Sequence, residues 1–172
     1  MKKVFSLLAA LILIITAGCE NQQKAQETPP PLPEKFSSDI NVTYGDISMT
    51  AVFTRNSANE FTVDFVTPEA LNPLSLYFKN GICTVDYDGL KFDADFNRFP
   101  QTETGALLIN AISDAVQGFE IQKLYSDGIW TYKGTGERGT FTLTQDAESG
   151  ALIEFRTDGA QLHIVFSNFK TN

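Results

Sequence analysis

Histidine and cysteine are scarce in this sequence, and each shortage excludes a class of site. The 172 residues include one histidine, His163, and two cysteines, Cys19 and Cys83. The usual zinc sites combine about four cysteine, histidine or carboxylate ligands, so a lone histidine cannot build one with other histidines or cysteines. A catalytic triad also needs an activated nucleophile, and the sequence carries no signature of one. We expect His163 to be an ordinary strand residue that faces solvent or is hydrogen-bonded.

Basic residues are also in short supply. Lysine and arginine together number 13 against 21 aspartates and glutamates, which gives a formal net charge of −8. Loss of a leader that contains Lys2 and Lys3 would take this to about −10 (−8 − 2). Nucleic acid and anionic bilayers both repel such a chain, which has no basic patch. The charge therefore predicts no nucleic-acid partner.

No apolar run reaches the length of a membrane-spanning helix. The run at residues 4–15 is preceded by Lys2 and Lys3 and falls well short of the roughly 20 residues that a span requires. This layout is typical of a secretory signal. It ends in Thr-Ala-Gly-Cys at residues 16–19, which resembles the bacterial lipobox. The resemblance implies cleavage after residue 18 and a diacylglycerol on Cys19, and the alternative is that Cys19 only ends a membrane helix.

The segment that follows predicts a tether. Residues 19–35 comprise the cysteine to be lipidated and a polar stretch with prolines at 29, 30, 31 and 33. Such a composition buries too little apolar surface to fold and favours an extended, semi-rigid spacer. At roughly 3 Å per residue it could hold the body up to about 50 Å from the bilayer. Two acyl chains anchor a protein stably, so we expect the chain at the extracytoplasmic face of the cell membrane.

Residues 36–172 predict a single β-rich domain. Apolar residues alternate with polar ones in segments such as 47–54, 61–66, 90–96 and 139–145, which is the period of a half-buried strand. Pairs of Asn-Gly or Asp-Gly at 80–81, 88–89, 127–128 and 158–159 favour two-residue hairpin turns. We predict a mainly β, α+β fold with about ten antiparallel strands.

One segment departs from this alternation. Residues 103–117 place Leu108 and Ile112 at helical spacing, and Leu107 adds an apolar residue beside that stripe. A helix of about 14 residues is about 21 Å long. Ten strands about 4.8 Å apart would make a flat sheet about 48 Å wide, which this helix cannot cover. The sheet must therefore curl around the helix, close on itself or leave apolar surface for something else.

The whole arrangement resembles a known superfamily. A lipobox, a spacer and a curved antiparallel sheet with a helix on its concave face are similar to the LolA/LolB-like lipoprotein-localisation carriers and to bacterial lipoproteins of that architecture. Residues 66–100, with strands separated by Asn/Asp-Gly turns, are similar to the repeated strands of these proteins. The resemblance implies an open half-barrel lined with apolar residues, and several such proteins bind acyl chains or lipidated proteins there.

Other chemistry receives little support from the residues. Cys83 shares a strand face with Val85, which favours a small buried apolar residue over a nucleophile. The stretch 93–97 imitates the start of a calcium loop, but Arg98 stands where the loop needs glycine. The acids Asp86 and Asp88 share a strand end without any sign of a substrate cleft. We expect no metal and no cofactor.

The resulting functional prediction is a non-catalytic, monomeric lipoprotein anchored to the membrane through Cys19. Its concave face would bind an apolar ligand, either a lipid or an acylated peptide. The alternative is an envelope module with a closed core that binds a protein partner or has a structural role. The residues expected to contact the ligand are Phe53, Phe65, Phe92, Leu107, Leu108 and Ile112.

Overall fold

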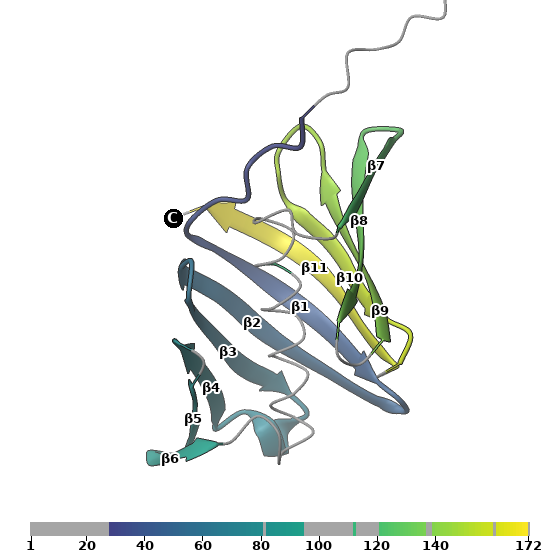
Figure 1. The fold of residues 1–172 in the computed structure, drawn as a ribbon. Coiled ribbons are helices and arrows are strands. Elements are labelled where there is room, and N and C mark those ends of the chain that lie inside the picture. Colours follow the sequence, from purple (N-terminus) through teal and green to yellow (C-terminus); the bar gives the residue numbers. More distant parts are fainter. Residues whose placement is uncertain are drawn as a thin grey trace, which may run out of the picture.

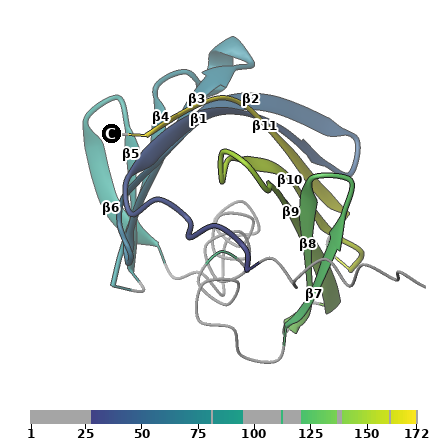
Figure 2. The same ribbon diagram turned by 90° about the horizontal axis from the view of Figure 1, so that it is seen from above.

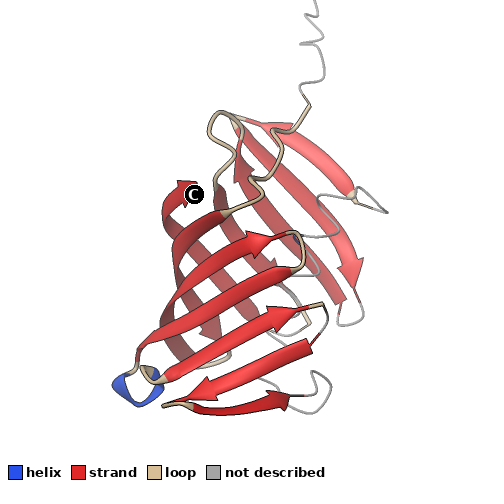
Figure 3. Ribbon diagram, turned by 90° about the vertical axis from the view of Figure 1, so that its left-hand side faces the viewer, coloured by secondary structure: helices blue, strands red, loops and turns tan. Residues whose placement is uncertain are grey.

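The chain folds into one strongly curved antiparallel sheet (Figure 1). The structure is a computed structural model that describes residues 28–80, 82–94, 112, 121–136, 139–159 and 161–171. Figures 2 and 3 show the sheet wrapping around a concave side, with its two edges kept apart. The predicted open half-barrel is therefore confirmed.

Eleven strands form this sheet, against about ten predicted. The first six are β1 (Phe36–Tyr44), β2 (Ile47–Ser57), β3 (Glu60–Thr67), β4 (Leu74–Lys79), β5 (Ile82–Tyr87) and β6 (Leu90–Ala94). The remaining five are β7 (Gln122–Ser126), β8 (Ile129–Gly136), β9 (Gly139–Asp146), β10 (Leu152–Thr157) and β11 (Leu162–Thr171). A 3-10 turn, η1 (Glu69–Leu71), lies between β3 and β4.

The strand order explains why the sheet stays open. The strands β1 to β6 pair in chain order, as do β7 to β11, and the first and last strands, β1 and β11, pair with each other in the middle of the sheet. The two edges are β6 and β7, which are consecutive in the sequence but not paired. The half-barrel thus opens between β6 and β7.

The hairpin turns follow the sequence signals in all but one case. Asp88 and Gly89, and likewise Asp127 and Gly128, have positive φ angles and form two-residue turns. This is the conformation whose twist suits a hairpin. The fourth predicted turn is wrong: residues 158–161 all lie between the paired residues Thr157 and Leu162. The connection from β10 to β11 is a four-residue loop.

The predicted helix at residues 103–117 lies outside the described residues, with one exception. Ile112 is described, is fully buried and belongs to the hydrophobic core of the sheet. This fits its expected place on an apolar stripe. No helix in the described ranges is long and apolar enough to cross a membrane.

Bulges contribute to the curvature. The pairing register shifts between Ser37 and Asp39 in β1 and between Arg55 and Ser57 in β2. A further shift separates Leu152 from Glu154 in β10. An extra residue on one strand bends that strand and increases its twist. Since these strands lie near the middle of the sheet, the bulges help it to curl rather than remain flat.

Candidate ligand-binding face of the sheet

The candidate site is the face of the sheet that the buried side chains occupy, which we call the inner face. Strand alternation and the pairing register bring the same face of every strand to this side. Its buried apolar residues come from β1 to β6 and from β8 to β11, and include Phe36, Ile40, Phe61, Leu76, Val85, Ala94, Trp130, Leu143, Phe155 and Ile164. The inner face is thus predominantly apolar along the whole sheet.

Phenylalanines concentrate where β1, β2, β3 and β11 meet. The Phe53 ring lies 5.8 Å from Phe36, 5.7 Å from Phe61 and 6.3 Å from Phe166, measured between ring centroids. The Phe36 ring stacks on Phe169 at 4.7 Å. Aromatic pairs at these separations add to the stability that their burial already provides. These five residues, the phenylalanine cluster, form the most aromatic part of the inner face.

The residues predicted to contact a ligand have different surroundings. Phe53 and Phe65 are buried on the inner face, and Ile112 is buried in the core. Phe92 pairs with the inner residue Val85, but it is 51% exposed because it lies on the edge strand β6. Leu107, Leu108 and Cys19 lie outside the described residues. The described part therefore brings Phe53 and Phe65 to one surface and places Phe92 at its open rim.

Four polar side chains are buried in this apolar surface: Ser38, Arg55, Gln145 and Thr157. The Ser38 hydroxyl donates to the carbonyl of Ser167 at 2.6 Å, which satisfies it. Gln145 accepts a hydrogen bond from the Tyr132 hydroxyl at 2.6 Å and donates to the carbonyl of Gly150 at 2.9 Å. The sequence analysis did not single out Arg55 or Gln145. The signal was present, because the period-two pattern of residues 51, 53 and 55, and of 141, 143 and 145, puts both on the apolar face.

Burial changes the titration of two groups near this surface. It raises the pKa of the Tyr132 hydroxyl to about 12 and that of the free, buried thiol of Cys83 to about 11. A thiol that stays protonated is a poor nucleophile. This confirms that Cys83 is a small buried residue.

A segment of the predicted tether crosses the inner face. We call residues 28–35 the strap. The carbonyl of Pro30 accepts from Gln145 Nε2 at 3.3 Å, and the carbonyl of Pro33 accepts from Arg55 Nη1 at 2.9 Å. Leu32 packs against the core between these two points. Since Arg55 is in β2 and Gln145 in β9, the strap links the two halves of the curved sheet, and Figure 2 shows it running across the concave side.

Arg55 is the charged member of the inner face. Its side chain pairs across the sheet with Phe36 and Phe61, and its guanidinium carbon lies 5.9 Å from the centre of the Phe61 ring. Burial lowers the pKa of the guanidinium, and the negative charge of Glu34 opposes part of this shift. The Nε of Arg55 is buried without a hydrogen-bond partner. Thr157 Oγ1 is also unpaired, but it lies toward the opposite end of β1.

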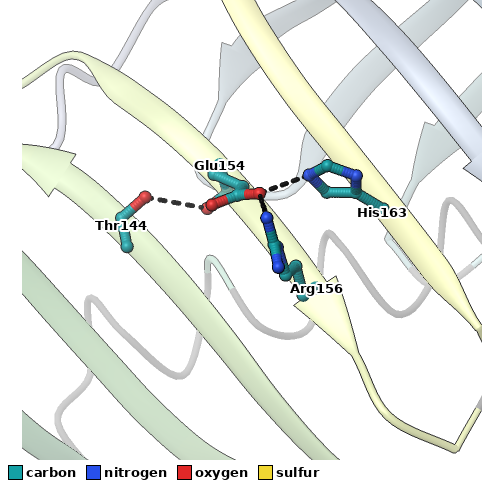
Figure 4. A network of polar contacts seen from close by, with 4 residues as sticks. All are labelled: Thr144, Glu154, Arg156 and His163. Carbon is teal, nitrogen blue, oxygen red and sulfur yellow. Dashed lines mark hydrogen bonds and ion pairs between the residues drawn. The ribbon is translucent and has the colours of Figure 1, made fainter.

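The outer face carries a separate polar network (Figure 4). Glu154 Oε1 pairs with His163 Nε2 and also accepts from Arg156 Nε at 2.5 Å. Thr144 Oγ1 donates to the backbone carbonyl of Glu154 at 3.4 Å. His163 alternates with the buried residues Leu162 and Ile164, so the prediction of a hydrogen-bonded strand histidine is confirmed. A catalytic triad would need the hydroxyl of a nucleophile hydrogen-bonded to the histidine ring. The Thr144 hydroxyl instead donates to the backbone of Glu154.

No metal centre emerges from the described residues. They contain no group of three or more histidine, cysteine, aspartate or glutamate residues that could hold an ion. Asp93, which the sequence placed at the start of a calcium-like stretch, accepts a hydrogen bond from Thr84 Oγ1 at 2.8 Å. Asp86 accepts from the backbone of Gly89 and forms an ion pair with Lys91. These acids are explained by contacts on and around a hairpin.

Comparison with known proteins shows the fold. No protein-family model and no curated protein matches the chain. An uncharacterised conserved protein from Thermus thermophilus is similar in structure, with a TM-score of 0.54 and 9% identity over 82% of this chain and 80% of that one. Its likeness shows that the two chains share an architecture: an open antiparallel half-barrel.

Two further solved structures are less similar. A LolA superfamily protein from Nitrosomonas europaea has a TM-score of 0.42 and 10% identity over 87% of this chain and 91% of that one. A DUF1329 family protein from Desulfovibrio piger has a TM-score of 0.41 and 10% identity over 81% and 86% of the two chains.

Proposed function

We propose that this chain is a non-catalytic lipoprotein, anchored through Cys19 at the extracytoplasmic face of the cell membrane, whose inner face binds an apolar ligand. The ligand is a lipid or an acylated peptide. The observation that carries the proposal is the predominantly apolar inner face of a sheet that stays open between β6 and β7. Binding sites for apolar ligands are concave and lined mainly by aliphatic and aromatic side chains with few polar groups.

The open rim adds support. Leu90 and Phe92 on β6 are 71% and 51% exposed, and Tyr87 beside them is also exposed. Their pairing register places them on the inner face, next to the buried residues Val85 and Cys83. An acyl chain passing between the two edges of the sheet would meet these side chains first.

A fluorescent fatty acid titrated into the full chain tests this proposal. The protein is held in nanodiscs of neutral lipid, and the signal of empty nanodiscs is subtracted. Affinity should strengthen with acyl length, by up to about fourfold for each additional fully buried CH₂ group, because each contributes about 0.8 kcal/mol. A folded protein that leaves the probe signal equal to that of empty nanodiscs at every chain length would refute the proposal.

A matched pair of variants locates the binding. Phe92→Ser removes an exposed aromatic side chain from the inner face, and Lys91→Ser changes the adjacent exposed residue on the outer face. Neither should unfold the protein, since both side chains are solvent-accessible. Phe92→Ser should weaken probe binding several-fold and Lys91→Ser should leave it unchanged. Equal effects would place the binding elsewhere.

A protein partner is the second candidate function. Edge strand β6 exposes Leu90 and Phe92, and an edge strand has backbone groups that a second chain could pair with. Under this alternative, the parent protein would bind no acyl probe. Phe92→Ser would instead weaken its binding to the protein partner.

A further inference from the structure

Arg55 is a charged side chain buried on a predominantly apolar face of the sheet. It is only 5% exposed, and the register of β2 points it to the same side as Phe53 and Ala51. Among the described residues no carboxylate forms an ion pair with it. Arginine keeps its proton in proteins, so it cannot escape burial by becoming neutral. A buried charge that is not directly paired is destabilising.

The direct contacts of Arg55 are with neutral groups, and the negative charge of Glu34 compensates only part of its burial. Its Nη1 donates to the carbonyl of Pro33, and its guanidinium lies over the ring of Phe61. A carbonyl and an aromatic face both stabilise a cation, but neither removes its charge. The Nε atom is buried and has no hydrogen-bond partner. Such a group is costly unless another molecule satisfies it.

The unpaired Nε of Arg55 is a charged donor that an anion would satisfy. The Pro33 carbonyl accepts from Nη1, and Nε is the buried donor that has no partner. An N–H group of arginine forms a strong, charge-assisted hydrogen bond with an oxygen of a carboxylate or phosphate. Arg55 also stands at a bulge, where the register shifts before Ser57. Bulges re-aim side chains and are common beside functional sites.

The position of Arg55 suits the head of a long ligand. It pairs with Phe36, the first residue of β1, next to the strap and beside the phenylalanine cluster. From there the inner face continues along β1 through Ile40 and Val42 to Tyr44. The eight steps from Phe36 to Tyr44 span about 27 Å at roughly 3.4 Å each. A ligand with its charge at Arg55 would therefore have an apolar surface ahead of it for its chain.

We propose that Arg55 binds the oxyanion head group of the ligand, so that the ligand is an anionic amphiphile with a carboxylate or phosphate at one end of an acyl chain. The inference rests on the proposed function and narrows it. It excludes neutral lipids, esters and acylated peptides that have no anionic group beside the acyl chain.

The test measures discrimination between heads on the same chain. The full chain in neutral nanodiscs is titrated with a fluorescent fatty acid, its methyl ester and a lysophosphatidic acid competitor, with empty nanodiscs subtracted. The parent should bind the carboxylate at least about tenfold more tightly than the ester, since hydrogen bonds to a charged group contribute about 1.5–3 kcal/mol. Lysophosphatidic acid should displace the probe, and millimolar inorganic phosphate should not.

Variants at Arg55 show whether this residue is responsible. Arg55→Met keeps an apolar stem and should reduce the preference for the carboxylate to about one while binding of the ester persists. Arg55→Lys should retain part of the preference. Arg156→Met, which removes an exposed arginine from the outer face, should retain all of it. A merely structural role for Arg55 would instead weaken carboxylate and ester binding equally, and circular dichroism of each variant checks that it is folded.

The outcomes separate the two proposals. If the parent binds both probes equally, or if Arg55→Met keeps the full preference, the head-group site is wrong and the apolar ligand remains. Displacement of the probe by inorganic phosphate would also overturn it, because the site would then take small anions without a chain. If the parent binds neither probe, the proposed function itself fails.

Discussion

Replacing Gln145 by leucine should destabilise the protein more than any exposed glutamine replacement. Gln145 is fully buried and serves three partners: the Tyr132 hydroxyl, the Gly150 carbonyl and the Pro30 carbonyl. Leucine leaves the first two without this partner inside the core. Each buried polar group left unpaired costs about 1–3 kcal/mol, and the added apolar burial of leucine offsets part of this. We expect a loss of about 2–4 kcal/mol in the free energy of unfolding.

Urea unfolding followed by the fluorescence of Trp130, the single tryptophan, measures this loss. Trp130 is buried and pairs with Gln145 across β8 and β9, so its signal reports on this part of the core. Gln122→Leu, at an exposed position of β7, is the matched control and should change stability by less than about 0.5 kcal/mol.

A double-mutant cycle tests the cause. Tyr132→Phe removes the hydroxyl that Gln145→Leu leaves unpaired, so the double variant should lose less stability than the two single variants added together, by about 1 kcal/mol. Release of Pro30 should also expose the backbone near Lys35 to trypsin sooner than in the parent. A urea midpoint for Gln145→Leu equal to that of the parent, or strictly additive losses in the cycle, would refute this reasoning.

Three further predictions concern the sheet, the thiol and the anchor. Gly134→Ala should cost about 1–3 kcal/mol in the same urea assay, because the new Cβ would lie 2.5 Å from the ring of Phe141, and Phe141→Leu in the same chain should recover part of the loss. Burial raises the pKa of the Cys83 thiol from 9.0 to about 11, so the folded state keeps a proton that the unfolded state releases in this range. The effect of this thiol on the free energy of unfolding is constant below about pH 9 and becomes destabilising toward pH 11. Cys83→Ala should therefore flatten the dependence of stability on pH between these values. An unchanged slope would contradict the prediction. Cys19→Ser should release the chain from membranes or stall its processing, as fractionation and mass measurement would show, and a variant that is processed normally and stays bound after a salt wash would exclude lipid anchoring.

Local signals were sufficient to predict most of the sheet. The alternation of Phe61, Val63 and Phe65 against polar neighbours gave a strand with its buried face correctly assigned. Asp88 and Gly89 gave a turn because few residues adopt positive φ easily. The same signal misled at Asp158, because a dipeptide does not fix how many residues a loop contains. Pairing of β1 with β11, which sets the open order of the strands, joins the two ends of the domain and has no local signal.

The candidate site was only partly readable. Phe53 and Phe65 follow from alternation, and their burial on the inner face is confirmed. The exposure of Phe92 depends on β6 being an edge, which strand order decides. The strap could not be foreseen, because it is held through backbone carbonyls that every residue possesses, and its composition indicated only an unfolded spacer.

The observed strap also changes the expected reach of the anchor. If residues 28–35 stay on the domain, the reach of the anchor is set by the nine residue-to-residue steps from Cys19 to Thr28 (28 − 19 = 9). At roughly 3.3 Å per extended residue this spans about 30 Å, compared with about 50 Å for a fully detached tether. The concave side, which the strap crosses, would then stay close to the bilayer from which a lipid could come.

Native mass spectrometry of the full chain, extracted gently from membranes, tests the central claim most directly. We predict that the folded protein carries one non-covalent acyl ligand per chain and that this ligand is anionic. Arg55→Met should lose the ligand, and Arg156→Met should keep it. A folded parent chain whose mass corresponds to the protein and its covalent lipid alone, and which takes up no acyl probe afterwards, would show that the inner face binds no such ligand.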